Sequence, residues 1–279
     1  MSHARPGVAD KRRTFRQLHA SGCFVMPNPW DVGSALYLQS LGFKALATTS
    51  AGFAWGQGRA DNAVTRAQVL EHLQAMVAAT DVPINADFEN GFGRDADEVG
   101  ESVALAVQTG IAGLSIEDST GNAAEPLFDI DVAVERLRAA RRAIDAAGGD
   151  TLLVGRSEGF LFGRTDVQEA IERLQAYARA GADCLFAPGI RTREQIAALV
   201  GAVAPRPLNL VISSAGELTV AQIAALGVRR ISVGGSLARS AWSGFTRAAR
   251  LIADEGRFDG FKDTIASAEL NTTFRELAG

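Results

Sequence analysis

Residues 82–118 read VPINADFENGFGRDADEVGESVALAVQTGIAGLSIED. An apolar run at 82–89 is followed by a segment of helical periodicity at 95–109 and by a second apolar run at 111–118. Both runs are apolar along most of their length, as strands are when a parallel sheet is buried on both faces. The stretch therefore predicts one strand–helix–strand unit, and each strand ends in an acidic string.

The same alternation continues on both sides of this unit. Apolar runs lie at 23–27, 43–49, 82–89, 111–118, 151–158, 183–187, 208–213 and 229–234. Helical segments lie at 31–41, 65–80, 95–109, 129–147, 166–180, 192–203, 219–226 and 236–253. Eight strand-then-helix units within roughly 230 residues favour a closed (β/α)8 TIM barrel over an open doubly wound sheet, which usually has fewer strands and a glycine fingerprint.

Local signals agree with these boundaries. Side chains suited to cap helix N-termini precede six of the segments: Asp31, Thr65, Asp95, Asp166, Thr192 and Thr219. Glycines follow four helix ends, at positions 42, 110, 181 and 227. A helix at 10–20 and a C-terminal helical tail at 258–277 fall outside the repeat. No linker divides the chain, so residues 1–279 are expected to form a single barrel domain.

Composition excludes several classes of function. The chain has 28 Lys and Arg against 32 Asp and Glu, a net charge of -4, and its basic residues are scattered. Nothing calls for nucleic acid or a membrane as partner. Residues 1–16 are polar and lack the apolar core of a secretory signal. The two cysteines, Cys23 and Cys184, predict no disulfide framework, and a cytoplasmic location is expected.

In a (β/α)8 barrel the chemistry lies at the C-terminal ends of the strands. The three histidines, at positions 3, 19 and 72, fall in the N-terminal tail, the first helix and an outer helix. The three lysines, at 11, 44 and 262, do not follow a strand either, and Lys44 begins one. Histidine acid–base catalysis and a Schiff-base mechanism therefore have no candidate residue.

Carboxylates and one arginine do follow the strands. Asp87 and Glu89 are two residues apart, so both leave the same face of their strand, and Glu117 ends the next one. Oxygen ligands of this kind suit a hard cation such as Mg²⁺. Arg156 is placed to bind a substrate carboxylate with two hydrogen bonds. The small residues Thr49, Ser50 and Ala51 present hydroxyl and amide groups that could cradle an oxyanion.

Each of these features has a structural alternative. Asp87 and Glu89 could cap the helix after the Gly-rich turn, and Glu117 with Asp118 could cap a helix or line the barrel rim. Arg156 and Glu158 could form a rim salt bridge, and 49–50 could be an ordinary turn. Gly234-Gly235-Ser236, after the eighth strand, could be a phosphate-binding loop or a simple tight turn.

Taken in order, these motifs resemble the isocitrate lyase/phosphoenolpyruvate mutase superfamily over residues 14–256. The resemblance rests on Asn-Pro-Trp-Asp at 28–31, Thr-Thr-Ser-Ala-Gly at 48–52, the segments 58–61 and 86–93, Ile-Glu-Asp at 116–118, Gly-Arg-Ser-Glu at 155–158, and the segments 180–183 and 226–235.

The resemblance implies a (β/α)8 barrel, commonly a homotetramer built as a dimer of dimers with its last helix exchanged between subunits. It implies Mg²⁺, with Mn²⁺ able to replace it, and a small 2-oxo carboxylate that reacts through an enolate-like intermediate. By motif position, the metal residues are Asp87, Glu89 and Glu117, and the catalytic residues are Asp61, Arg156 and Glu117. The substrate-binding residues are Thr49, Ser50, Ala51, Arg156, Glu158 and Asn209.

Departures from the family pattern bear on the reaction. The family's C–C lyases carry a gating loop with Lys, Cys and His after the Glu-Asp strand, whereas residues 119–126 here read STGNAAEP. The phosphonate-active branch places a Lys and an Asn in that loop and commonly a His after strand six, where this chain has Ala187-Pro188-Gly189. Of these residues of the phosphonate-active branch, only the loop Asn has a counterpart here, at Asn122.

A decarboxylase needs least from that loop, since the metal itself withdraws electrons from a 2-oxo acid. The sequence therefore favours a Mg²⁺-dependent C–C lyase of oxaloacetate-decarboxylase or retro-aldol type. A phosphonomutase or phosphonopyruvate hydrolase, and a barrel that binds 2-oxo acids without catalysis, remain alternatives.

Overall fold

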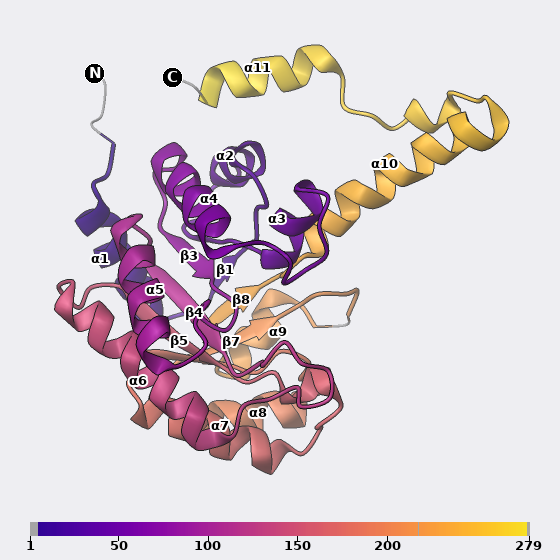
Figure 1. Ribbon diagram of the computed structural model, residues 1–279. Helices are drawn as coiled ribbons and strands as arrows, with labels where there is room; N and C mark the ends of the chain where they lie inside the picture. The colour runs from indigo at the N-terminus through magenta and orange to yellow at the C-terminus, as the bar shows by residue number, and fades with distance from the viewer. Residues whose placement is uncertain (1–4, 217, 278–279) are drawn as a thin grey trace.

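The computed structural model describes residues 5–216 and 218–277 of the chain. Its centre is a sheet of eight parallel strands in the order β1-β8-β7-β6-β5-β4-β3-β2 (Figure 1). The strands are β1 Phe24–Met26, β2 Leu46–Ala47, β3 Ile84–Asp87, β4 Gly113–Glu117, β5 Leu152–Arg156, β6 Cys184–Phe186, β7 Leu208–Val211 and β8 Arg230–Ser232. Each lies inside one of the predicted apolar runs.

The first and last strands close the sheet into a barrel. β1 pairs with β8, from Phe24 opposite Arg230 to Met26 opposite Ser232. The remaining seam is bridged by the Ala47 amide, which donates a hydrogen bond of 3.1 Å to the Pro27 carbonyl. The predicted (β/α)8 barrel is therefore confirmed. Helix exchange between subunits involves a second chain, and it stays a prediction.

Helices surround the barrel. They are α1 Val8–Ala20, α2 Val32–Ser40, α3 Ser50–Gly56, α4 Arg66–Ala79, α5 Ala96–Gln108, α6 Ile130–Ala146, α7 Val167–Arg179, α8 Arg193–Val203, α9 Val220–Ala225, α10 Ser236–Glu255 and α11 Ser267–Leu277, with 3₁₀ turns η1 Gly159–Phe162 and η2 Asp259–Phe261. All six predicted N-cap side chains accept a hydrogen bond from the first turn of their helix. The four predicted glycines have positive φ values, which confirms them as helix stops.

The bottom of the barrel is closed by α1. Phe15 of this helix is fully buried and packs with Met26, Ala45, Ala47, Ala112 and Leu152. Gly113 at the start of β4 makes room for it, because a Cβ atom there would lie 2.7 Å from the Phe15 ring and 2.8 Å from Asn85 Oδ1. The N-terminal helix thus fixes which end of the barrel stays open.

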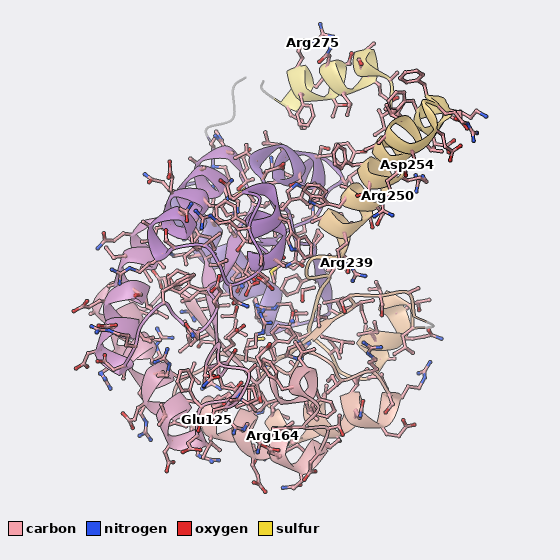
Figure 2. All side chains as sticks on the ribbon, turned by 45° about the vertical axis from the view of Figure 1, so that its right-hand side comes forward. Glu125, Arg164, Arg239, Arg250, Asp254 and Arg275 are labelled. Carbon is pink, nitrogen blue, oxygen red and sulfur yellow. The ribbon has the colours of Figure 1, made fainter. Side chains whose placement is uncertain are left out.

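At the other end of the chain, α10 extends away from the barrel and α11 returns to lie over α2 (Figure 1). In Figure 2, Arg239, Arg250 and Asp254 follow one another along α10. Large apolar side chains of this arm are exposed, including Trp242, Phe245, Phe258, Phe261 and Ile265. Over the described ranges, no helix is both long enough and apolar enough to cross a membrane.

Candidate active site

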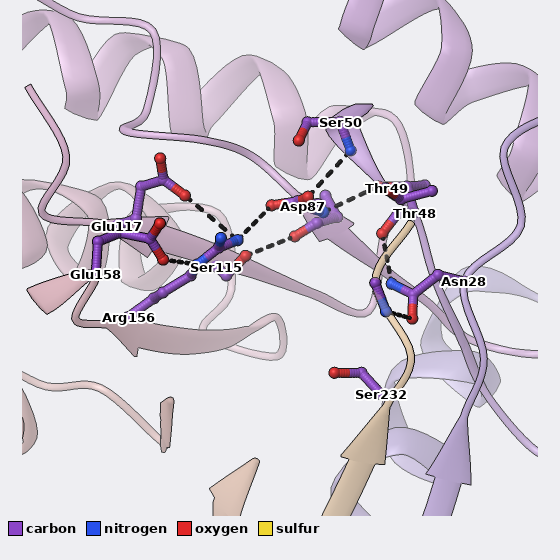
Figure 3. A network of polar contacts seen from close by, with 12 residues as sticks. Asn28, Thr48, Thr49, Ser50, Asp87, Ser115, Glu117, Arg156, Glu158 and Ser232 are labelled. Atoms are coloured by element: carbon purple, nitrogen blue, oxygen red, sulfur yellow. Dashed lines mark hydrogen bonds and ion pairs between the residues drawn. The ribbon is translucent and has the colours of Figure 1, made fainter. Parts of the chain in front are cut away.

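The open end of the barrel is organised around Arg156, the last residue of β5. Its Nη1 atom lies 3.0 Å from Asp87 Oδ1 and 3.3 Å from Glu117 Oε2. Its Nε atom donates a hydrogen bond of 2.5 Å to Glu158 Oε1 (Figure 3). Glu117 and Arg156 are register partners across β4 and β5, so strand pairing itself brings them together. The salt bridge between Arg156 and Glu158, one of the sequence alternatives, is present.

Asp87 is held from a second side. Its Oδ2 atom accepts a hydrogen bond of 3.0 Å from the Ser50 amide, and its own amide donates to the Thr48 hydroxyl at 2.9 Å. The Thr48 carbonyl in turn accepts a hydrogen bond from Asn28 Nδ2 at 2.9 Å. Asp87 therefore links the ends of β1, β2 and β3 to the arginine on β5 (Figure 3).

The predicted oxyanion cradle at 49–51 has a different local role. Thr49 is the N-cap of α3, and its hydroxyl accepts a hydrogen bond from the Gly52 amide at 3.3 Å. The Ser50 amide is used by Asp87. Residues 49–51 still line the cavity described below, but the Ser50 amide already donates to Asp87, whereas the Thr49 hydroxyl only accepts and keeps its proton to donate. Sequence periodicity did not reveal α3 because the helix is only seven residues long.

Carboxylates outnumber the guanidinium at this rim. Burial raises the pKa of Glu117 well above its usual range, against the effect of Arg156, and Glu158, Asp87 and Glu89 raise it further. Burial also raises the pKa of Glu158. For Arg156, burial alone would lower the pKa, but Glu158, Glu117 and Asp87 outweigh it and raise the pKa. The rim thus has an excess of buried acid that favours a further cation.

Glu89 and Asp61 form the less satisfied side of the rim. Burial, followed by the charges of Asp87 and Asp61, raises the pKa of Glu89 to about 8. Its Oε1 atom is buried and has no hydrogen-bond partner within the described part of the chain. Burial likewise raises the pKa of Asp61, which the Ser50 hydroxyl lowers and Asp87 raises again.

Backbone strain accompanies this carboxylate. Glu89 has a φ of 47°, in the left-handed region that side chains other than Gly, Asn and Asp seldom adopt. The following loop is held from below by Arg136, whose Nη2 atom donates hydrogen bonds of 2.8 Å to the Asn90 and Gly93 carbonyls. Arg136 also stacks on the Phe128 ring, with its guanidinium carbon 4.4 Å from the ring centroid.

These observations bear on the predicted metal. In residues 5–216 and 218–277, no group of three or more His, Cys, Asp or Glu side chains is arranged as a closed metal site. The donor set nevertheless fits a hydrated hard cation, because burial and the charge of Asp87 raise the pKa of both Asp61 and Glu89, and the buried Oε1 atom of Glu89 has no hydrogen-bond partner among the described residues. Mg²⁺ usually keeps several waters and needs only one or two protein carboxylates. Glu117 faces Arg156, with which it forms an ion pair.

A cavity of about 350 Å³ opens beside Arg156. Of the predicted site residues, it is lined by Thr49, Ser50, Ala51, Asp61, Asp87, Arg156 and Asn209. Glu117 and Glu158 stand behind Arg156 and do not line it, nor does Glu89. One wall is apolar and comes from three separate loops: Leu161, Phe186, Pro188, Ile190, Ile212 and Leu218. Sequence reasoning missed this wall because no single segment carries it.

A buried network behind the rim was also missed. Asp118 Oδ2 accepts hydrogen bonds from the Tyr177 hydroxyl at 2.6 Å and Arg173 Nη1 at 3.1 Å. Its Oδ1 atom accepts one from the Glu158 amide at 2.8 Å. Asp118 therefore positions the residue that pairs with Arg156. The acidic string in the sequence includes Asp118, but no local pattern indicates that Arg173 and Tyr177, more than fifty residues away, are its partners.

Two sequence alternatives can now be weighed. The Gly234 amide and the Val233 amide before it both donate to Asn28 Oδ1 at 2.9 Å, so the glycine loop at 234–236 has one amide fewer to offer a phosphate. The loop at 119–127 closes on itself, with the Thr120 amide donating to the Pro126 carbonyl at 2.9 Å. It contributes no side chain to the cavity wall, and its Glu125 lies at the edge of the molecule (Figure 2).

A closed barrel with buried acids and one arginine at its C-terminal rim is the arrangement of a (β/α)8 enzyme. Residues 15–253 match the family model of phosphoenolpyruvate phosphomutase. The chain belongs to this family, within the phosphoenolpyruvate mutase/isocitrate lyase superfamily that the sequence motifs predicted.

Curated relatives include an uncharacterised protein of Mycobacterium tuberculosis, 32% identical over 244 residues, or 86% of this chain and 89% of that protein. An oxaloacetate decarboxylase of Chromohalobacter salexigens is 29% identical over 282 residues, with 97% of this chain and 91% of that protein covered.

Solved structures are similar to this chain over nearly its whole length. A protein of Burkholderia cenocepacia J2315 described as a lyase/mutase has 44% identity and a TM-score of 0.93, covering 96% of this chain and 97% of its own. Oxaloacetate acetylhydrolase bound to its product oxalate has 25% identity and a TM-score of 0.85, covering 97% and 95% of the two chains.

Proposed function

We propose that this chain is a divalent-metal-dependent C–C lyase acting on a small 2-oxo or 2-hydroxy dicarboxylate, with decarboxylation of oxaloacetate as the first candidate reaction. The observation that carries the proposal is Arg156, held by Asp87, Glu117 and Glu158 at the wall of a 350 Å³ cavity. Relatives named oxaloacetate decarboxylase and oxaloacetate acetylhydrolase support this choice of substrate.

Arg156 would bind the substrate carboxylate. Its Nε and Nη1 atoms are used by the rim acids, whereas Nη2 has no hydrogen-bond partner in the part of the chain that the structure describes. Because its three acidic neighbours fix the guanidinium, a carboxylate that binds Nη2 meets a donor already in position. Asn209 lines the deeper part of the same cavity.

Asp87 and Glu89 would hold a Mg²⁺ or Mn²⁺ ion, and Asp61 and Glu117 would bind its waters or balance its charge. When bound, the cation would withdraw electrons from the 2-oxo group and stabilise negative charge on its oxygen. The apolar wall from Leu161 to Leu218 would keep water from the reacting carbon, which strengthens the electrostatic interactions.

Decarboxylation suits the loop at 119–127. The reaction breaks the bond between the second carboxyl group of oxaloacetate and its neighbouring carbon, and releases CO₂ and, after protonation, pyruvate. It requires no thiol, lysine or histidine from the loop, which has none and lies away from the cavity.

The exposed apolar arm formed by α10, η2 and α11 further leads us to propose a homo-oligomer, with the family tetramer as the expected form.

The experiment compares pyruvate release from oxaloacetate and from phosphonopyruvate, each with Mg²⁺ and with chelator, after subtraction of the metal's own decarboxylation rate. Chelator-sensitive release from oxaloacetate is expected. Release from phosphonopyruvate alone would move the chain to the C–P branch. Tight binding of oxalate without turnover of either compound would indicate a binding barrel instead.

A further inference from the structure

The cavity continues below the rim and ends on a second arginine, Arg230 at the start of β8. Arg230 and Asn209 line the cavity together with Asn85 and Ser232. Asn85 precedes Asp87 by two residues on β3, so its layer lies roughly 7 Å below the rim acids. Two small residues, Ala47 opposite Asn85 and Ser115 opposite Asp87, also line the cavity and leave it open at these levels. The floor of the cavity is therefore inside the barrel.

Arg230 carries a buried charge whose partners are all neutral. Its side chain is 2% exposed. Nε donates to Asn209 Oδ1 at 2.8 Å, and Nη1 lies 3.3 Å from Asn85 Oδ1 and 3.4 Å from His19 Nε2. Among the described residues, none forms an ion pair with it. A guanidinium stays protonated in proteins, and buried charges normally have a counter-charge.

The neighbouring titratable groups do not supply that charge. Burial, and then the charge of Arg230, lowers the pKa of His19 to about 3, which leaves its ring neutral. Its Nδ1 atom is 2.7 Å from the Phe15 carbonyl, so the proton sits on Nδ1 and Nε2 accepts from Arg230. Burial raises the pKa of the Cys184 thiol, so it is neutral as well. The rim acids Asp87, Glu117 and Glu158 pair with Arg156 instead.

Donor groups remain available on the cavity side. Nη2 of Arg230 has no hydrogen-bond partner in residues 5–216 and 218–277. The Ser232 hydroxyl accepts from Asn209 Nδ2 at 3.0 Å, which leaves its proton free to donate. Figure 3 places Ser232 on β8 below Asn28. An anion at this point would receive a charged donor and a hydroxyl donor in a space that is shielded from solvent.

We propose that the cavity floor is an anion-binding site, in which Arg230 and Ser232 hold a small monoanion. The anionic group is either a free halide or a carboxylate of a ligand that reaches down from the rim. In both cases the site balances the charge of Arg230, and it stands whether or not the chain is a C–C lyase.

The direct test is a crystal of the full chain grown with sodium bromide, with data collected at the bromine absorption edge. An anomalous peak within hydrogen-bond distance of Arg230 Nη2 is expected. Water alone at that point, in crystals that show bromide elsewhere, would overturn the proposal. A second crystal with bromide plus malonate separates the two sources, because loss of the peak with carboxylate density in its place identifies a ligand group.

A solution measurement gives an independent answer. The melting temperature of the wild type should rise by several degrees when sodium gluconate is replaced by sodium bromide at equal ionic strength. Arg230→Met should remove that rise, whereas Arg138→Met, a change of an exposed arginine on α6, should keep it. An equal rise in both variants would contradict the proposal. If Arg230→Met does not fold, Ser232→Ala should still raise the bromide concentration needed for half of the stabilising effect several-fold.

Discussion

Arg156 Nη1 and Asp87 Oδ1 lie 3.0 Å apart, although β5 and β3 do not pair with each other. β4 lies between them and contributes Glu117 to the same guanidinium. The contact therefore depends on the barrel curving the three strand ends toward one point. It also places Arg156 where the acids would otherwise repel one another.

Arg156→Met tests this charge balance. Breaking a buried ion pair by removing one partner typically costs about 3–5 kcal/mol, because the remaining charges are left unpaired. We expect the variant to lose about that much stability and to have kcat/KM on oxaloacetate reduced by about 100-fold or more. Added Mg²⁺ should restore more stability to Arg156→Met than to wild type. Arg138→Met is the control and should match wild type in both measurements.

Strain at Glu89 gives a prediction that separates backbone from side chain. The backbone at Glu89 has a φ of 47°. Glycine adopts this conformation without a steric penalty, whereas alanine has the same penalty as Glu89. Glu89→Gly should therefore be more stable to denaturant than Glu89→Ala by about 1 kcal/mol. Both should lose metal affinity to the same extent, because both lack the carboxylate. Equal stability of the two variants would show that the left-handed conformation is not strained here.

Acid sensitivity should report on His19. Its pKa is lowered to about 3 in the folded state from 6.5 when unfolded, so the unfolded chain binds one more proton between these values. The stability that neutral His19 permits is complete above pH 6.5 and is lost as pH falls toward 3. For His19→Gln, the slope of unfolding free energy against pH near pH 5 should be smaller by about 1.4 kcal/mol per pH unit. Unchanged slopes would mean that His19 is not buried in its neutral form.

The apolar arm leads to a prediction about assembly. Trp242 and Phe245 of α10 contact each other edge to face, with ring centroids 5.3 Å apart, yet both are exposed. If a second copy covers them, Trp242→Arg combined with Phe245→Arg should convert the oligomer to a monomer in light scattering after gel filtration. Leu41→Arg, at an exposed apolar residue after α2, is the matched control. A wild-type monomer would contradict the proposed assembly.

Fold and site differ in how far the sequence predicts them. The eight strands could be predicted because burial on both faces makes them continuous apolar runs, and the helix boundaries because capping residues such as Asp95 and Thr192 act locally. The seven-residue helix after Thr49 is too short to show a period.

Within the site, residues at strand ends such as Asp87 and Arg156 could be placed at one rim because parallel strands all end there. The side chains that contact the site residues could not be predicted in this way. The Asp118 contact with Tyr177, the apolar wall and the buried Arg230 each depend on side chains from distant segments. These meet only after the barrel has closed, so no local pattern reveals them.

The most direct test of the central claim uses metal-free protein and follows pyruvate release from oxaloacetate as Mg²⁺ is added back. Wild type and Asp87→Asn are measured side by side, and the rate of Mg²⁺ without protein is subtracted. The account predicts that the wild-type rate rises with Mg²⁺ to saturation and that Asp87→Asn is about 100-fold slower at every concentration. A folded Asp87→Asn that matches wild type, or a wild-type rate independent of Mg²⁺, would contradict it.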